Sequence, residues 1–175
     1  VLLVPDGVPG APALAFADGA QIEWGRVSTA PLVDKLLRAG RPVLSIDISG
    51  CGEIGKPKHY FYSTHRTRRP EEATGVMLYM LGESLVGRRA GDILVAADYL
   101  KGRFGAKPTL HAVGSVAIAA AHARAAAPDL VGAVEDLVEP PPSWTVMVDE
   151  PVRHVYFADC VNGALEFYDW TDLLK

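Results

Sequence analysis

Residues 109–127 read TLHAVGSVAIAAAHARAAA, and this stretch decides the fold class that the sequence predicts. Residues 110–113 form a short apolar run typical of a buried strand, whereas residues 115–126 have the alanine-rich composition of a helix. Pro128 ends that helix, because proline cannot continue its backbone hydrogen bonding. A strand that turns sharply into a helix of small residues predicts a helix packed closely on a sheet.

The chain before this stretch predicts the same alternation of strand and helix. Residues 1–4 and 42–48 are apolar enough for strands, and a helix is expected between them with Pro31 in its first turn. Residues 8–27 are rich in Gly, Ala and Pro, which is typical of a loop. Strand, helix and strand at this spacing predict a βαβ unit with parallel strands.

Further elements are expected on either side of the central stretch. Residues 49–75 predict a long irregular loop, and residues 76–104 predict a helix that its glycines could divide in two. Residues 131–138 predict a fourth strand. After it, residues 144–148 are compatible with a short strand or a helical turn, and residues 170–174 with a short helix.

Together these elements predict a single α/β domain over residues 1–175, with a doubly wound, mostly parallel sheet of about four or more strands and helices on both faces. We expect the domain to be part of a longer chain, because the sequence starts with Val1 and not with methionine. Ligands bind such sheets beyond the carboxyl ends of the strands. The segments expected at that edge are 5–7, 49–52, 114–115 and 139–140.

Composition and charge argue against several classes of function. Hydrophobic residues make up 49% of the 175 residues and charged residues 22%, as in ordinary globular proteins. A net charge of -4 gives no reason to expect nucleic acid as a partner, and no apolar run reaches the ~20 residues that span a bilayer. Cys51 and Cys160 form no metal-binding pattern, and they are expected to be free thiols, with one disulfide as the alternative.

Residues 50–55 read GCGEIG and match the G-x-G-x-x-G spacing of dinucleotide-binding loops. Such a loop needs a helix immediately after it, because the N-terminus of that helix receives the phosphates. The sequence KPKH follows at 56–59 and starts a helix badly. A loop after a strand is therefore the better interpretation, and no cofactor is expected.

The turn after Val113 has the layout of a nucleophile elbow, in which a strained turn needs small residues two positions before and two positions after the nucleophile. If Gly114 is the first small residue, Val116 takes the nucleophile position and has no nucleophilic atom. If Ser115 is the nucleophile, its flanking positions are Val113, which is bulky, and Ala117. Ser115 is thus the candidate catalytic residue, with capping of the helix as the alternative role for its hydroxyl.

A serine nucleophile also needs a histidine base that a carboxylate orients. Of the five histidines, His111 lies in an expected strand and His122 in an expected helix, so both are interpreted as structural. His59 and His65 lie in the expected long loop and could reach the strand ends, whereas His154 lies late in the chain. No spacing of histidines or carboxylates matches a metal-binding motif, so no metal is expected.

The pattern as a whole resembles the α/β-hydrolase superfamily. Residues 1–7 look like the strand that ends in the oxyanion loop, with Asp6 where a histidine is common. Residues 36–53 look like the next strand with its D-x-R-G-x-G-x-S stretch, although Ser49 stands for the arginine. Residues 109–127 look like the strand and helix of the elbow.

Within that superfamily the chain is most similar to carbohydrate esterases of the acetyl xylan esterase and cephalosporin-C deacetylase type. Residues 85–100 resemble the helix before the elbow in those enzymes, and residues 163–174 resemble the segment that leads into their next strand. The resemblance implies an oxyanion hole near Asp6 and Gly7, completed by the backbone N–H of Val116.

Two departures from the family pattern bear on function. The turn lacks G-x-S-x-G, and the sequence stops at Lys175, before the region of the family's catalytic acid and histidine. Three functions therefore stay open. The first is a non-catalytic α/β-hydrolase-like domain of a carbohydrate-esterase-type protein, which acts as a scaffold or binding module beside a catalytic domain of the same protein.

The second function is an active carboxylic ester hydrolase that uses Ser115 with triad partners outside this chain. The third is a flavodoxin-like ligand-binding domain, since four parallel strands in this connectivity also suit a phosphate-bearing ligand. The resemblance to carbohydrate esterases further implies an ester or carbohydrate ligand and a secreted or periplasmic location.

Overall fold

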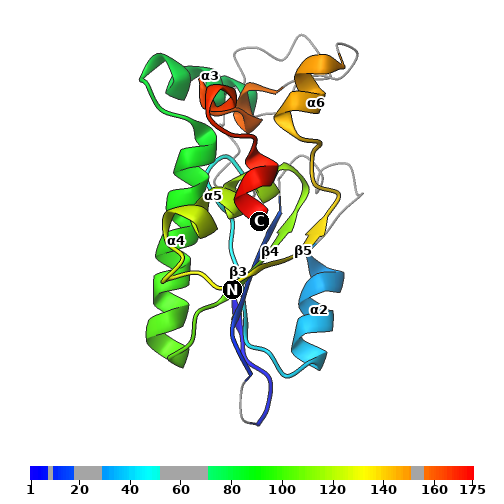
Figure 1. Ribbon diagram of the computed structural model, residues 1–175. Helices are drawn as coiled ribbons and strands as arrows, with labels where there is room; N and C mark the ends of the chain where they lie inside the picture. The colour runs from blue at the N-terminus through cyan, green and yellow to red at the C-terminus, as the bar shows by residue number, and fades with distance from the viewer. Residues whose placement is uncertain (8–9, 18–28, 52–70, 151–155) are drawn as a thin grey trace.

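The computed structural model describes residues 1–7, 10–17, 29–51, 71–150 and 156–175. They form a five-stranded, mostly parallel sheet with helices on both faces, so the predicted α/β fold class is confirmed (Figure 1). The strands are β1 (Leu2–Leu3), β2 (Ala13–Ala17), β3 (Val43–Ser45), β4 (Thr109–Val113) and β5 (Val134–Val138). The helices are α2 (Ala30–Arg38), α3 (Glu71–Met80), α4 (Leu85–Phe104), α5 (Ala117–Ala126) and α6 (Trp144–Asp149), and the 3₁₀ turns are η1 (Gly114–Val116), η2 (Phe157–Asp159), η3 (Ala164–Glu166) and η4 (Trp170–Leu174).

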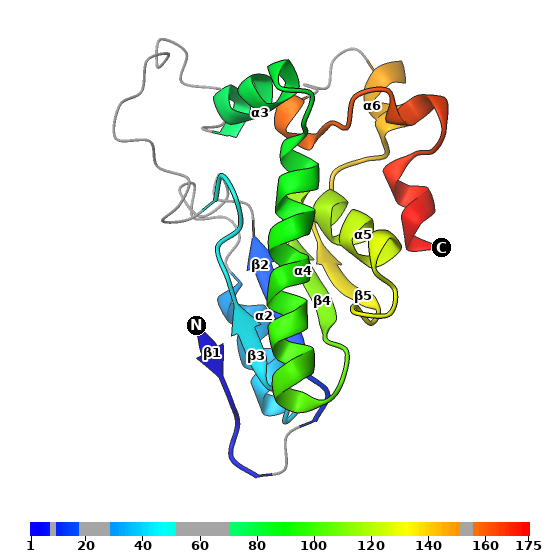
Figure 2. The same ribbon diagram turned by 90° about the vertical axis from the view of Figure 1, so that its left-hand side faces the viewer.

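The strands follow the order β1-β3-β2-β4-β5 across the sheet. β2 pairs in parallel with both β3 and β4, and β5 pairs in parallel with β4. β1 alone is antiparallel, with Leu2 opposite Leu44 on the edge of β3. Figure 2 shows the consequence, since β1 runs down the sheet while β3 beside it runs up.

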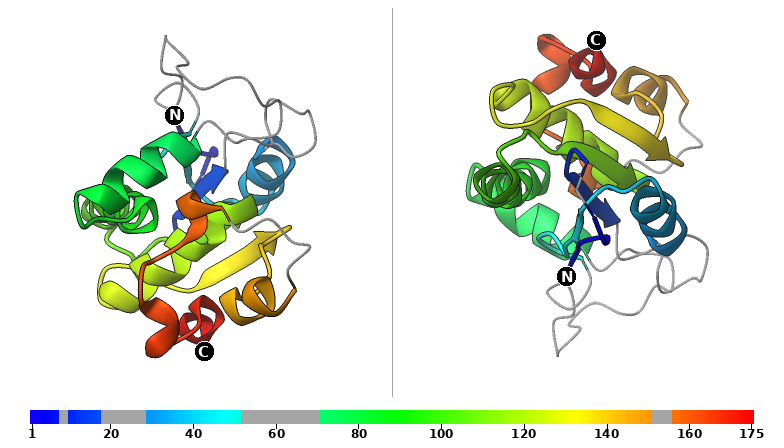
Figure 3. Two further views of the ribbon diagram at one scale, coloured as in Figure 1. Left: turned by 90° about the horizontal axis from the view of Figure 1, so that it is seen from above. Right: turned by 90° about the horizontal axis from the view of Figure 1, so that it is seen from below.

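The core lies on both faces of the central strand β2. Alternate side chains of a strand point to opposite faces. Leu14 and Phe16 therefore join the larger cluster under α4 and α5, whereas the alanines of β2 join a smaller cluster with Leu32 and Leu36 of α2. The views along the sheet in Figure 3 show α2 on one face and α4 with α5 on the other.

The prediction of a loop over residues 8–27 is wrong where β2 lies. The sequence ALAFA contains no β-branched residue, and alanine is depleted in strands, so propensity alone does not indicate a strand. All of its residues are buried, because helices cover both faces and small side chains let them approach. Tertiary packing therefore decides the strand. Residues 8–9 and 18–27 of the predicted loop lie outside the described residues.

The predicted βαβ unit is also corrected. Residues 1–4 and 42–48 are not the parallel pair, because β1 and β3 are antiparallel. The right partner is β2, which gives the unit β2-α2-β3 with parallel strands. The predicted helix with Pro31 in its first turn is confirmed as α2.

The predicted helix over 76–104 is two helices, as its glycines allowed, and the first of them begins at Glu71, where a loop over 49–75 was predicted. Residues 52–70 of that predicted loop lie outside the described residues. Gly82 adopts a left-handed φ of 77° between α3 and α4, a backbone conformation that glycine reaches without steric cost. Ser84 then caps α4, since its hydroxyl accepts a 3.0 Å hydrogen bond from the N–H of Gly87. The helical turn at 144–148 and the short helix at 170–174 are confirmed as α6 and η4.

Candidate functional site

The elbow at the carboxyl end of β4 has a glycine at its sharp position. Gly114 follows Val113 with a φ of 82°, and the chain then passes through η1 into α5. In a nucleophile elbow the nucleophile occupies this strained strand-to-helix turn. Neither predicted frame anticipated it, because they put Val116 or Ser115 there. The one signal in the sequence was the glycine itself, which is the residue that favours a positive φ.

Ser115 lies one residue past the strained position. Its side chain is buried, with 4% of the residue exposed, and it belongs to η1. The N-cap positions of η1 and α5 are Val113 and Val116, so Ser115 caps neither turn. Val116 is completely buried, and it packs in the larger core cluster.

Asp6 and Gly7 do not join this edge of the sheet. They follow β1, and because β1 is antiparallel to β3 they lie toward the amino ends of the parallel strands. Figures 1 and 2 show this blue segment descending to the end of the molecule opposite α3 and α6. The prediction that Asp6 and Gly7 form an oxyanion hole with Val116 is therefore wrong, since such donors must lie about 3 Å from the same oxygen.

The loop after β3 does reach the carboxyl edge, where helix α4 holds it in place. The backbone N–H and the hydroxyl of Ser49 donate hydrogen bonds of 2.7 and 2.6 Å to Asp92 Oδ2. Arg89 Nε donates a 2.9 Å bond to the Ser49 carbonyl, and Arg89 Nη2 lies 3.4 Å from Cys51 Sγ. Arg89 and Asp92 lie on one face of α4, because they are three residues apart. We call this group the Arg89 clamp.

A buried ion pair completes the Arg89 clamp. Arg89 Nη2 lies 3.9 Å from Glu71 Oε1 of α3, and the side chains of both residues are 1% exposed. Gly50 passes beside this pair with a φ of 79°, a backbone conformation that favours glycine. The resemblance of residues 85–100 to a helix of esterases implied no role for Arg89 or for Asp92. The structure shows that both position the loop after β3.

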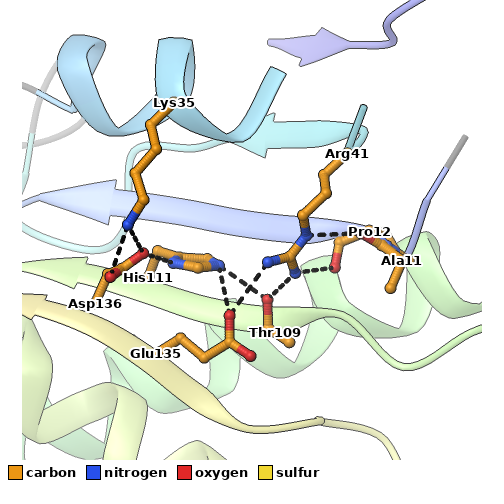
Figure 4. Close-up of polar contacts among 8 residues, drawn as sticks. All are labelled: Ala11, Pro12, Lys35, Arg41, Thr109, His111, Glu135 and Asp136. Carbon is orange, nitrogen blue, oxygen red and sulfur yellow. Dashed lines mark hydrogen bonds and ion pairs between the residues drawn. The ribbon is translucent and has the colours of Figure 1, made fainter. Parts of the chain in front are cut away.

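A second polar network lies on the other face of the sheet, under α2 (Figure 4). His111 is completely buried at its centre, with Nε2 2.9 Å from Thr109 Oγ1 and Nδ1 3.3 Å from Asp136 Oδ2. Lys35 of α2 donates to both oxygens of Asp136, at 3.0 and 2.9 Å. Arg41 donates to Thr109 Oγ1 and pairs with a carboxylate of β5 at 3.2 Å.

An irregularity in β5 lets two successive carboxylates face His111. The register between β4 and β5 shifts next to His111, and Asp136 has a φ of 45°. As a result both Glu135 and Asp136 lie near the imidazole, at 3.8 and 3.3 Å. Burial nevertheless lowers the pKa of His111, and the guanidinium of Arg41 lowers it further, against the two carboxylates.

Thr109, His111 and Asp136 contact one another in the sequence nucleophile, base and acid that a catalytic triad has. The network nevertheless has a structural role, because it connects several strands. The imidazole is fully buried, and Arg41 occupies the Thr109 hydroxyl. Arg41 also donates to the Ala11 carbonyl at 3.1 Å, so the network joins the segment before β2 to β4 and β5. This position agrees with the structural role predicted for His111.

His122 is likewise engaged away from the elbow turn. Its Nδ1 donates a 2.7 Å hydrogen bond to the Ile118 carbonyl, which fixes the tautomer, and Nε2 accepts from the Tyr168 hydroxyl at 2.9 Å. Burial lowers the pKa of His122, against the effect of the Ile118 carbonyl. Neither described histidine therefore offers a nitrogen to Ser115. The other three, His59, His65 and His154, lie outside the described residues.

The described residues contain neither a metal cluster nor a helix that could cross a membrane. Within residues 1–7, 10–17, 29–51, 71–150 and 156–175, no three His, Cys, Asp or Glu side chains gather as a metal site would require. The same residues include no helix with both the length and the hydrophobicity to cross a membrane. Cys51 and Cys160 are free thiols, as expected. Most of the G-x-G-x-x-G stretch, residues 52–55, lies outside the described residues.

Comparison of the chain with protein-family models, with curated proteins and with solved structures gave no match. The geometry of the chain itself is therefore the basis for assigning a function.

Proposed function

We propose that this chain is an α/β-hydrolase-like domain whose elbow does not catalyse hydrolysis, and that it serves as a scaffold or binding module in a carbohydrate-esterase-type protein. The observation that carries the proposal is Gly114, which stands with a φ of 82° at the turn between β4 and η1. An ester hydrolase of this type needs a nucleophilic oxygen at that turn, and glycine has no side chain to supply it.

The arrangement of the strands supports the α/β-hydrolase part of the proposal. The order β1-β3-β2-β4-β5, with β1 antiparallel and the rest parallel, is the order that α/β-hydrolases use around their elbow strand. β3 lies on one side of β2 and β4 lies on the other, so the direction in which successive strands are added to the sheet reverses at β2. Open α/β sheets bind ligands at such a switch point.

The environment of Ser115 supports the non-catalytic part. A serine nucleophile must present Oγ to the substrate, with a histidine within hydrogen-bond reach. Ser115 is 4% exposed, and the ring nitrogens of the two histidines within the described residues, His111 and His122, contact Thr109, Asp136, Ile118 and Tyr168. The domain would then bind an ester or carbohydrate ligand without cleaving it, or support a catalytic domain of the same protein.

The test is hydrolysis of 4-nitrophenyl acetate by the purified protein, compared with Ser115→Ala. Ser45→Ala, which removes a hydroxyl from β3, is the matched control. We expect none of the three proteins to raise the rate of ester hydrolysis above the uncatalysed background, and we expect all three to resist labelling by a fluorophosphonate. Labelling of the unchanged protein, together with loss of hydrolysis in Ser115→Ala alone, would instead establish Ser115 as a nucleophile.

A further inference from the structure

A cavity of about 510 Å³ lies between α3, α6, the start of α4 and the turns η2 and η3. These elements gather at one end of the molecule in Figures 1 and 2, where the chain passes after leaving β3 and β5. We call this cavity the α3–α6 pocket. Its volume falls within the range of sites that bind small organic molecules, about 300–1,000 Å³. It is separate from the Gly114 turn and from the Arg89 clamp, whose residues do not line it.

The walls of the α3–α6 pocket are fixed by packing and by hydrogen bonds. The carboxylate of Glu72 in α3 accepts bonds from the N–H groups of Phe157 and Ala158 in η2, at 3.1 and 3.3 Å. Gly75 lets the two segments meet, because a Cβ there would lie 3.0 Å from the Ala158 nitrogen. On the opposite side, Trp144 of α6 donates its indole N–H to the Asp159 carbonyl at 3.0 Å. The pocket is thus formed before any ligand arrives.

The surface of the pocket is apolar with an acidic component. Trp144, Met147 and Phe157 contribute large apolar side chains, and Glu166 contributes a carboxylate. Glu83 contributes a second carboxylate, but it pairs with Arg88 at 2.5 Å, so the acidic character of the lining comes mainly from Glu166. None of the described residues that line it is a lysine or an arginine. Aromatic faces and carboxylates both attract cations, whereas carboxylates repel an anionic ligand.

The thiol in the pocket adds no reactive group. Burial, with help from the carboxylates of Asp159 and Glu72, raises the pKa of Cys160 to about 11. Cys160 is therefore protonated at neutral pH, and a thiol in that form is a poor nucleophile. Among the described residues that line the pocket, no group is poised to react, so their chemistry is that of a binding site.

We propose that the α3–α6 pocket binds a small, largely apolar organic molecule that is uncharged or cationic and that it discriminates against anions. This site does not depend on the elbow, so the chain can bind such a ligand whether or not Ser115 hydrolyses esters. The Phe157 ring, in edge contact with Tyr79 at a centroid distance of 5.4 Å, supplies one apolar wall.

Two fluorescent dyes that differ by one charged group test the proposal. N-phenyl-1-naphthylamine is uncharged, and 8-anilinonaphthalene-1-sulfonate carries the same ring system with a sulfonate. We expect the uncharged dye to bind saturably, one molecule per chain, and the sulfonate to bind about fivefold more weakly or worse, as repulsion by one nearby carboxylate predicts. Equal or tighter binding of the sulfonate, or binding that does not saturate, would overturn the proposal.

A pair of phenylalanine variants locates the dye. Phe157 lines the pocket with 48% of its surface exposed, whereas Phe167 is 84% exposed and lies outside the lining, so neither substitution removes a core residue. Phe157→Ala should weaken binding of the uncharged dye about tenfold, and Phe167→Ala should leave it unchanged. Equal effects of the two variants would show that the dye binds elsewhere and would refute the proposal.

Alkylation of Cys160 gives an independent readout. Cys51 is 1% exposed, so in the folded protein a maleimide reacts with Cys160 first. Because the pKa of the Cys160 thiol is about 11, the reaction is measured near pH 9, where more of the thiol is ionised than at neutral pH. We expect the uncharged dye to slow that reaction, as mass spectrometry of the modified peptide would measure, and to do so less in Phe157→Ala. An unchanged rate of Cys160 alkylation at saturating dye would contradict binding in this pocket.

Discussion

The Arg89 clamp makes a quantitative prediction about stability. Arg89 and Glu71 are both 1% exposed and their charged atoms are 3.9 Å apart. At an effective dielectric constant of ~20 their Coulomb attraction is about 4 kcal/mol, which offsets the cost of desolvating the two charges. Arg89→Met removes that attraction and leaves Glu71 as a buried charge. It also removes the hydrogen bond from Arg89 Nε to the Ser49 carbonyl, 2.9 Å long.

We therefore expect Arg89→Met to lower the free energy of unfolding by about 3–5 kcal/mol, the range for breaking one partner of a buried ion pair. Urea unfolding followed by tryptophan fluorescence measures this quantity. In the double variant with Glu71→Gln the loss should be smaller than the sum of the two single losses, because the second change also removes the buried charge of Glu71.

Arg88 provides the matched control for the Arg89 clamp. It is the neighbouring arginine of α4, but it is exposed and pairs with Glu83 at 2.5 Å on the surface. Arg88→Met should have little effect on unfolding, since exposed ion pairs contribute little. If Arg89→Met cost no more than Arg88→Met, or if the losses of Arg89→Met and Glu71→Gln were additive, the buried ion pair would not stabilise the loop after β3 and this reasoning would fail.

Three further changes probe other parts of the fold. Burial lowers the pKa of His111 below its usual 6.5, so the unfolded state binds a proton first as the pH falls. The free energy of unfolding should therefore decrease below about pH 6.5, by up to ~1.4 kcal/mol per pH unit. His111→Gln should reduce that slope in urea titrations from pH 5 to 7. Gly114→Ala places a Cβ on a backbone with a φ of 82° and should cost about 1 kcal/mol in urea unfolding, whereas Gly102→Ala within α4 should not destabilise the protein. Tyr168→Phe removes the hydroxyl that donates to His122 at 2.9 Å, and it should cost about 1 kcal/mol in the same assay; no change would mean that water replaces the bond.

The elements that the sequence predicted correctly are those in which local pattern and tertiary packing agree. α2 has Pro31 in its first turn and an apolar face, and β4 leads through Gly114 into an alanine-rich helix. β2 was missed because its residues are buried on both faces by contacts with distant segments, from α2 on one side to α4 and α5 on the other. Nothing within ALAFA indicates those partners. The direction of β1 was missed for the same reason, since its pairing with β3 joins residues about forty apart, as Leu2 and Leu44 are.

The elbow was located from the sequence, but its geometry was not. Gly114, Ser115 and Val116 are adjacent, and the pattern of small residues around them fits more than one frame. Backbone dihedral angles separate the frames, because only Gly114 has a positive φ. The Arg89 clamp could not be predicted either, since its members come from α3, α4 and the loop after β3, which are distant in the sequence. Nothing in the sequence indicates that Arg89 and Glu71 are buried together.

Gly114 and the Arg89 clamp together explain how an elbow without a nucleophile keeps its shape. A serine held at a φ of 82° would be strained by roughly 1–3 kcal/mol, a cost that active sites bear because the geometry serves the reaction. Glycine at position 114 releases that strain and keeps the sharp turn from β4 into α5. The Arg89 clamp still fixes the loop after β3 at the same edge, through charges whose burial is costly unless they are paired. An edge that is held in place while Gly114 stands at its turn is consistent with the proposed role of contacting a ligand or a neighbouring domain without cleaving an ester.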